Sequence, residues 1–147
     1  MLNNKIDFSA EQAMLLDTAN EFFRAKSAID VVRNQMVSKH GFDRAVWDEM
    51  VALGFSGIAI PEAHGGSEFG LAAAVTIAEA QGRHLGASPW LPTQLTIQGL
   101  LADQSGLADD ALSALAAGMI GSVAVCEPDA AWDLTQAELQ VTAAKPL

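Results

Sequence analysis

Basic residues are scarce in this sequence. Eight lysine and arginine residues stand against eighteen aspartate and glutamate residues, so the formal net charge is -10. The basic residues occur singly along the chain and form no stripe that could follow a phosphate backbone or an anionic lipid surface. We therefore expect neither nucleic acid nor a membrane among the partners of this protein.

Cysteine is almost absent as well. The single cysteine, Cys126, excludes an internal disulfide bond, and no Cys/His spacing resembles a metal site, so no metal is expected. No apolar segment typical of a secretory signal follows Lys5, and the apolar stretch 111–126 is shorter than the ~18 residues of a membrane span. These absences favour a soluble protein of the reducing cytoplasm.

Apolar residues, in contrast, make up 50% of the 147 residues, enough for the core of one compact domain. Ser9 followed by Gln12 predicts a capping box at the start of a helix over about 10–26, whose apolar residues recur at helical spacing. Asp43 predicts the N-cap of another helix over about 44–53, and Gly54 stands where a left-handed C-terminal residue is favoured.

Further helices are expected from periodicity at about 27–37, at 70–81, at 93–101 and from Asp109 onward, which makes five or six in the first 118 residues. The run 55–61 fits either a short strand or a buried extended connection, because Gly57 and Pro61 both disfavour a regular strand. The paired glycines Gly65 and Gly66 predict a tight loop after it.

The hydrophobic period changes after residue 118. Residues 120–126 predict a strand, 127–129 a turn and 139–142 a half-buried strand. Two short strands without a partner form a poor sheet in water. We therefore predict a mainly α fold with a helical domain over 1–118 and the first strands of an incomplete β-domain over 119–147. We expect the natural protein to continue past Leu147, or another chain to complete the sheet.

Several motifs in this order resemble the acyl-CoA dehydrogenase family. They are the capped helix after Asp7-Phe8-Ser9, the helix from Trp47 to Leu53 that leads into Gly54-Phe55, the loop Ile-Pro-Glu-Ala-His-Gly-Gly at 60–66, the helix end Glu-Ala-Gln-Gly-Arg at 79–83, and Cys-Glu-Pro at 126–128. The match spans essentially the whole chain.

The resemblance implies an FAD-dependent flavoprotein of lipid metabolism that dehydrogenates the α and β carbons of an acyl-CoA thioester. In the family, the flavin is contacted in part by the first strand of the β-domain, which matches Val123, Val125 and Cys126 here. The family's catalytic base comes from a C-terminal region, so no catalytic residue is assigned in this chain. The family is usually tetrameric, so a homo- or hetero-oligomer is expected.

Other candidate residues have two readings. Trp90, between two prolines, and Gln94, one turn later, either line the acyl-CoA substrate pocket or pack in the core or against another subunit. His64 lies in the glycine loop, but the sequence places no nucleophile or acid beside it, so a structural role is favoured.

The residues after Pro128 depart from the family pattern, since Trp132 stands where a small hydroxyl residue is usual. This departure favours a second hypothesis, a non-catalytic partner subunit of a heteromeric acyl-CoA dehydrogenase. A third, a small acidic helical interaction module, would leave the order of the motifs unexplained. In the first hypothesis the chain is the N-terminal portion of the enzyme, inactive alone, and FAD belongs to the intact protein.

Overall fold

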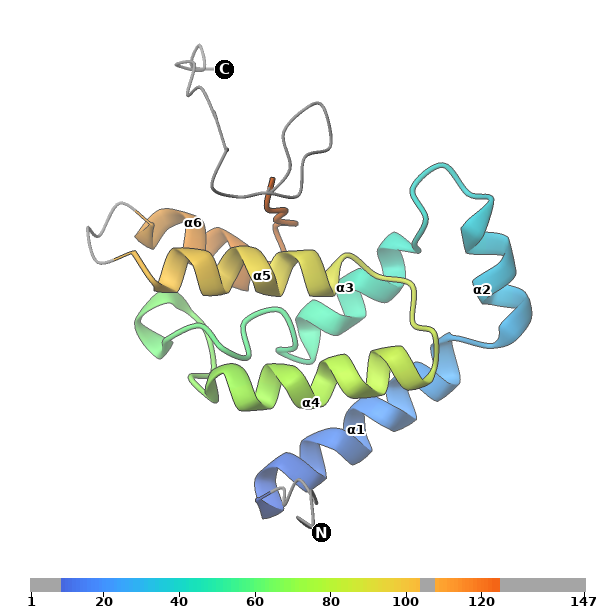
Figure 1. Ribbon diagram of the computed structural model, residues 1–147, viewed down its shortest axis with the longest axis horizontal. Coiled ribbons are helices and arrows are strands. Elements are labelled where there is room, and N and C mark those ends of the chain that lie inside the picture. The colour runs from blue at the N-terminus through green and yellow to red at the C-terminus, as the bar shows by residue number, and fades with distance from the viewer. Residues whose placement is uncertain (1–8, 104–107, 125–147) are drawn as a thin grey trace, which may run out of the picture.

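The computed structural model describes residues 9–103 and 108–124 of the chain. Within these residues the fold is mainly α, as predicted (Figure 1). Its elements are α1 (Ala10–Lys26), α2 (Ile29–Met36), α3 (Arg44–Ala52), the short 3-10 helix η1 (Glu62–His64), α4 (Gly70–Arg83), α5 (Trp90–Leu101) and α6 (Asp109–Ala116).

The longest helix, α1, begins with the predicted capping box. The Ser9 hydroxyl accepts a hydrogen bond from the Gln12 amide at 3.2 Å, and the Ser9 amide donates to Gln12 Oε1 at 2.9 Å. Helix α1 lies along α4 (Figure 1), where Ala19 and Phe23 are buried against small residues of α4 such as Ala73 and Ala80. The alanines of α4 allow this close approach.

The core consists of two clusters of buried apolar side chains. The larger one joins α1, α3 and α4 with the connection after α3 and with Trp90 of α5; its largest members are Phe23, Trp47, Met50, Phe55 and Trp90. The smaller one joins α5 and α6 through Ile60, Ile97, Leu112 and Leu115. Helix α5 contributes to both clusters, so one face of it is buried along much of its length, while Leu91 and Leu95 on another face are exposed.

Residues 55–60 form a buried connection rather than a strand. Helix α3 ends at Ala52, and Gly54 after it has a φ of +78°, the left-handed conformation expected from the sequence. The connection then runs beside residues 67–69, whose amides donate to the carbonyls of Gly57, Ile60 and Ile58. These bonds satisfy buried backbone groups without a regular ladder.

Two helix boundaries differ from those predicted. Helix α4 continues through Gly82 to Arg83, and its end is closed by Leu85, which adopts a φ of +53°. Helix α5 begins at Trp90 rather than at 93, because Pro92 lies in the first turn, where the missing N–H would have no helical partner.

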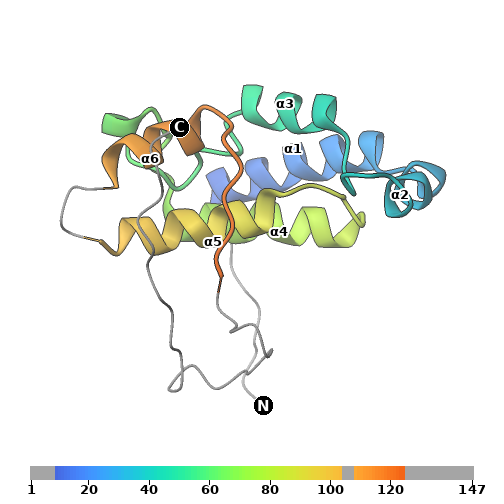
Figure 2. The same ribbon diagram turned by 90° about the horizontal axis from the view of Figure 1, so that it is seen from above.

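Helix α2 projects from one end of the molecule in both views (Figures 1 and 2), and none of its residues is buried. Residues 119–124, the last of the described residues, follow α6 without belonging to a strand, and they cross α5 (Figure 2). The rest of the predicted strand 120–126 and the predicted strand 139–142 lie outside the described residues.

Candidate functional site

Trp90 and Gln94, the two predicted pocket residues, lie on the buried face of α5. Trp90 is 1% exposed and Gln94 is 4% exposed. The Trp90 indole N–H donates to the Phe55 carbonyl at 3.0 Å, and Gln94 Nε2 donates to the Ser56 carbonyl at 2.9 Å. The two side chains therefore hold the connection after α3 against α5.

The buried face of α5 also carries side-chain polar atoms that form no hydrogen bond. Among the described residues, the buried atoms Gln94 Oε1 and Gln98 Nε2 have no hydrogen-bond partner. The two glutamines are one helical turn apart, so an acceptor and a donor lie on the same side of α5. Sequence reasoning missed Gln98, although its spacing of four from Gln94 in a mostly apolar helix is a signal that could have found it.

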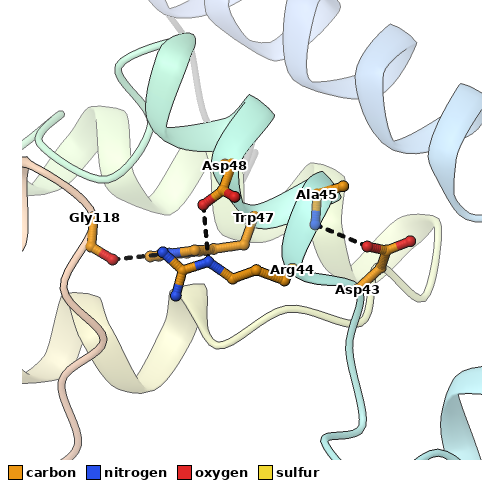
Figure 3. Close-up of polar contacts among 6 residues, drawn as sticks. All are labelled: Asp43, Arg44, Ala45, Trp47, Asp48 and Gly118. Atoms are coloured by element: carbon orange, nitrogen blue, oxygen red, sulfur yellow. Dashed lines mark hydrogen bonds and ion pairs between the residues drawn. The ribbon is translucent and has the colours of Figure 1, made fainter.

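After α6 the chain runs over residues of α3, of the connection after α3 and of α5. Gly118, two residues after the end of α6, has a φ of +101°, and its carbonyl accepts from the Trp47 indole N–H of α3 at 2.9 Å (Figure 3). The Ser56 hydroxyl donates to the Ala116 carbonyl at 2.9 Å. We call residues 116–121 the exit segment.

Two further polar contacts lie in the same part of α3 as Trp47. The Asp43 side chain accepts from the Ala45 amide at 2.8 Å, and Arg44 Nε donates to Asp48 at 2.9 Å (Figure 3). The first contact confirms the predicted N-cap. The second is an exposed ion pair between residues one helical turn apart, and such a pair contributes little to stability.

Thr93 of α5 makes the third contact with the exit segment. Its hydroxyl donates to the Pro89 carbonyl at 2.7 Å and accepts from the Gly121 amide at 3.2 Å. Thr93 is 0% exposed. No sequence pattern pointed to Thr93, because its partner lies 28 residues away.

Of the predicted flavin-contact residues, Val123 lies just past the exit segment, and Val125 and Cys126 lie outside the described residues. Val123 is 44% exposed. Within the described part of the chain, no hydrogen bond engages the backbone of residues 122–124. These residues therefore present free backbone groups beside an exposed apolar side chain.

A groove of about 340 Å³ lies elsewhere, between the first half of α1 and the start of α4. Met14 and Leu15 line one side, and Ile58, Phe69 and Ala73 line the other. His64, the loop histidine, lies 3.8 Å from the Asp109 carboxylate, a residue that sequence analysis did not pair with it. Within residues 9–103 and 108–124, no group of three or more His, Cys, Asp or Glu side chains could hold a metal ion, and no helix could span a membrane.

A comparison with models of protein families shows which family this chain belongs to. Residues 9–105 match the model of the acyl-CoA dehydrogenase N-terminal domain. The chain belongs to the acyl-CoA dehydrogenase family. This confirms the resemblance seen in the sequence motifs, and it assigns α1 to α5 to the N-terminal domain of that family.

Two solved structures share the fold of this acyl-CoA dehydrogenase domain. A variant of the Tcur3481-Tcur3483 steroid ACAD is 29% identical, with a TM-score of 0.69 over 74% of this chain and 30% of the other. The ChsE4-ChsE5 complex from Mycobacterium tuberculosis is 24% identical, with a TM-score of 0.73 over 83% of this chain and 34% of the other. The chain thus spans about a third of the length of these relatives. None of the curated protein sequences matches it.

Proposed function

We propose that this acyl-CoA dehydrogenase chain serves in the FAD-dependent α,β-dehydrogenation of an acyl-CoA thioester in the cytoplasm. Its family membership carries this proposal. Residues 1–118 would form the helical wall of the acyl-CoA pocket, and residues 119–147 would begin the flavin-binding β-domain. Bound FAD would supply the acceptor for the hydride that leaves the β carbon.

Two observations on residues 122–124 support a flavin contact there. Residues 122–124 offer backbone donors and acceptors that no other described group uses, and the apolar side chain of Val123 suits the face of an aromatic ring. We assign Val123, with Val125 and Cys126 after it, to this contact. No acidic residue of the chain is assigned as the base that removes the α proton.

The substrate side of the proposal rests on α5. The unpartnered atoms Gln94 Oε1 and Gln98 Nε2 are a buried acceptor and a buried donor. Both atoms are closed to solvent, so a polar group of the acyl-CoA would reach them only after the side chains around α5 move. A hydrogen bond formed there would offset the cost of about 1–3 kcal/mol that a buried polar atom without a partner carries. We assign Gln94 to orienting the substrate and Trp90 to shaping that end of the pocket from the core.

A non-catalytic partner subunit is the second candidate function. The names of both structural relatives pair two proteins, and one of them is a complex. The sequence departure at Ala131-Trp132 favours the same reading. In this role the chain would contribute its helical wall to a pocket whose flavin is held by an active dehydrogenase chain.

One experiment tests the proposal and separates the two candidates. The protein expressed from its own gene is purified, its flavin content is read from visible absorbance, and acyl-CoA-dependent reduction of an acceptor dye is measured. Bound FAD with dye reduction supports the proposal. Flavin and activity that are absent alone but gained on mixing with an active dehydrogenase chain support the partner subunit. If neither bound flavin nor activity is found, for the protein alone or for the mixture, both candidate functions are contradicted.

A further inference from the structure

The exit segment is held in place from several directions. Side chains from α3, from the connection after α3 and from α5 bind the carbonyl of Gly118, the carbonyl of Ala116 and the amide of Gly121. The first two bonds secure the end of α6. The bond from Thr93 is the last of them along the chain, and it lies two residues before Val123.

The hydroxyl of Thr93 is suited to this contact. Its proton goes to the Pro89 carbonyl at 2.7 Å, one turn back in the same helix, which leaves the oxygen lone pairs free to accept. The Gly121 amide occupies one of them at 3.2 Å, and the Gly121 carbonyl lies 3.5 Å from the same oxygen. Both backbone groups of Gly121 therefore face one buried side chain.

Close packing also fixes the exit segment against α5. A Cβ on Gly121 would lie 2.8 Å from Thr96 Cβ, so only glycine allows this approach. At Gly118 a Cβ would lie 2.9 Å from Val51 Cγ2. The path of residues 118–121 over α3 and α5 is thus set by hydrogen bonds and by contact together.

We propose that Thr93 is a positioning residue, which sets the direction in which the chain leaves the helical domain and so orients residues 122–124 toward the flavin. This inference rests on the proposed function, because the flavin contact of Val123 belongs to it. In this role Thr93 would contact neither the substrate nor the flavin. It acts through the backbone of Gly121.

The test uses two variants of Thr93 and one matched control. Thr93→Val keeps the shape of the side chain but removes the hydroxyl, and Thr93→Ser keeps the hydroxyl. Thr76→Val is the control, because Thr76 is also 0% exposed and donates to a carbonyl one turn back, that of Ala72 at 3.0 Å, but forms no hydrogen bond with the exit segment. All three variants are made in the protein expressed from its own gene.

Amide hydrogen exchange at Gly121 is the first measurement and requires no flavin. Thr93→Val is expected to raise the exchange rate about tenfold, and Thr93→Ser and Thr76→Val to leave it within about twofold. An unchanged rate in Thr93→Val would show that Thr93 does not hold the exit segment and would overturn the inference.

FAD affinity, measured by quenching of flavin fluorescence, is the second measurement. Thr93→Val is expected to weaken FAD binding about tenfold, with rescue by Thr93→Ser and no change in Thr76→Val. Equal FAD affinity in Thr93→Val and the wild type overturns the inference while the proposed function stands. If the wild type binds no FAD, the flavin part of the proposed function fails, and exchange at Gly121 still decides whether Thr93 positions the exit segment.

Discussion

Two adjacent glycines after η1 are required for different reasons. Gly65 adopts a φ of +79° with nothing within 4 Å of a Cβ, so the requirement lies in the backbone conformation alone. At Gly66 a Cβ would lie 2.0 Å from the Ile60 carbonyl oxygen. The sequence predicted a tight loop from the pair, but it could not show that one of the two glycines packs directly against the connection after α3.

This difference predicts unequal effects of alanine. Gly65→Ala is expected to lower the free energy of unfolding by about 1–2 kcal/mol, the penalty for a left-handed residue with a side chain. Gly66→Ala is expected to lower it by about 3 kcal/mol or more, because the Ile60 backbone would have to move. Urea denaturation measures both, and similar losses in the two variants would contradict the packing role of Gly66.

At the scale of one element, the capping box of α1 was readable from sequence because it is local. Ser9 and Gln12 are three residues apart and bind each other's amides. The end of α4 was not readable, because Leu85 takes the left-handed position after the helix, a conformation that usually belongs to glycine. The start of α5 was missed since two prolines mark a break in sequence but are compatible with the first turn of a helix.

The capping box also predicts a measurable contribution to stability. Ser9→Ala should lower the free energy of unfolding by about 1 kcal/mol, because the Gln12 amide then loses its acceptor. Gln12→Glu is the matched control, since glutamate also completes a capping box and should leave stability near that of the wild type. Thermal unfolding followed by circular dichroism measures both; a Ser9→Ala variant as stable as Gln12→Glu would contradict the role of the cap.

Across the whole molecule, stability is expected to be uneven. Helix α2 has 8 residues, none of them buried, and Met36 is 78% exposed. Isolated helices shorter than about 12–15 residues are marginal in water. We therefore expect amide hydrogen exchange in α2 at least about a hundredfold faster than in α4, which buries five residues. Mass-spectrometric exchange on peptides of both helices checks this, and equal protection would contradict it.

The sequence allowed prediction of the helical architecture and the family, because both rest on local spacing and on motif order. It did not allow prediction of how the exit segment is held. Trp47 and Gly118 are 71 residues apart and Ser56 and Ala116 are 60 apart, so no window of sequence contains both partners. Trp90 and Gln94 were found as candidates, but their bonds to the carbonyls of Phe55 and Ser56 became visible only in the structure.

The long sequence separation of the bonds to residues 116 and 118 has a consequence for the order of folding. Closing a long loop carries an entropic cost that is met before its contact forms, whereas the turns of α1, α3 and α4 close locally. During synthesis, Trp47 and Ser56 also leave the ribosome well before Gly118. We expect the exit segment to dock late, onto a helical core that has already assembled. The orientation of any domain that follows would then be set only after that core has formed.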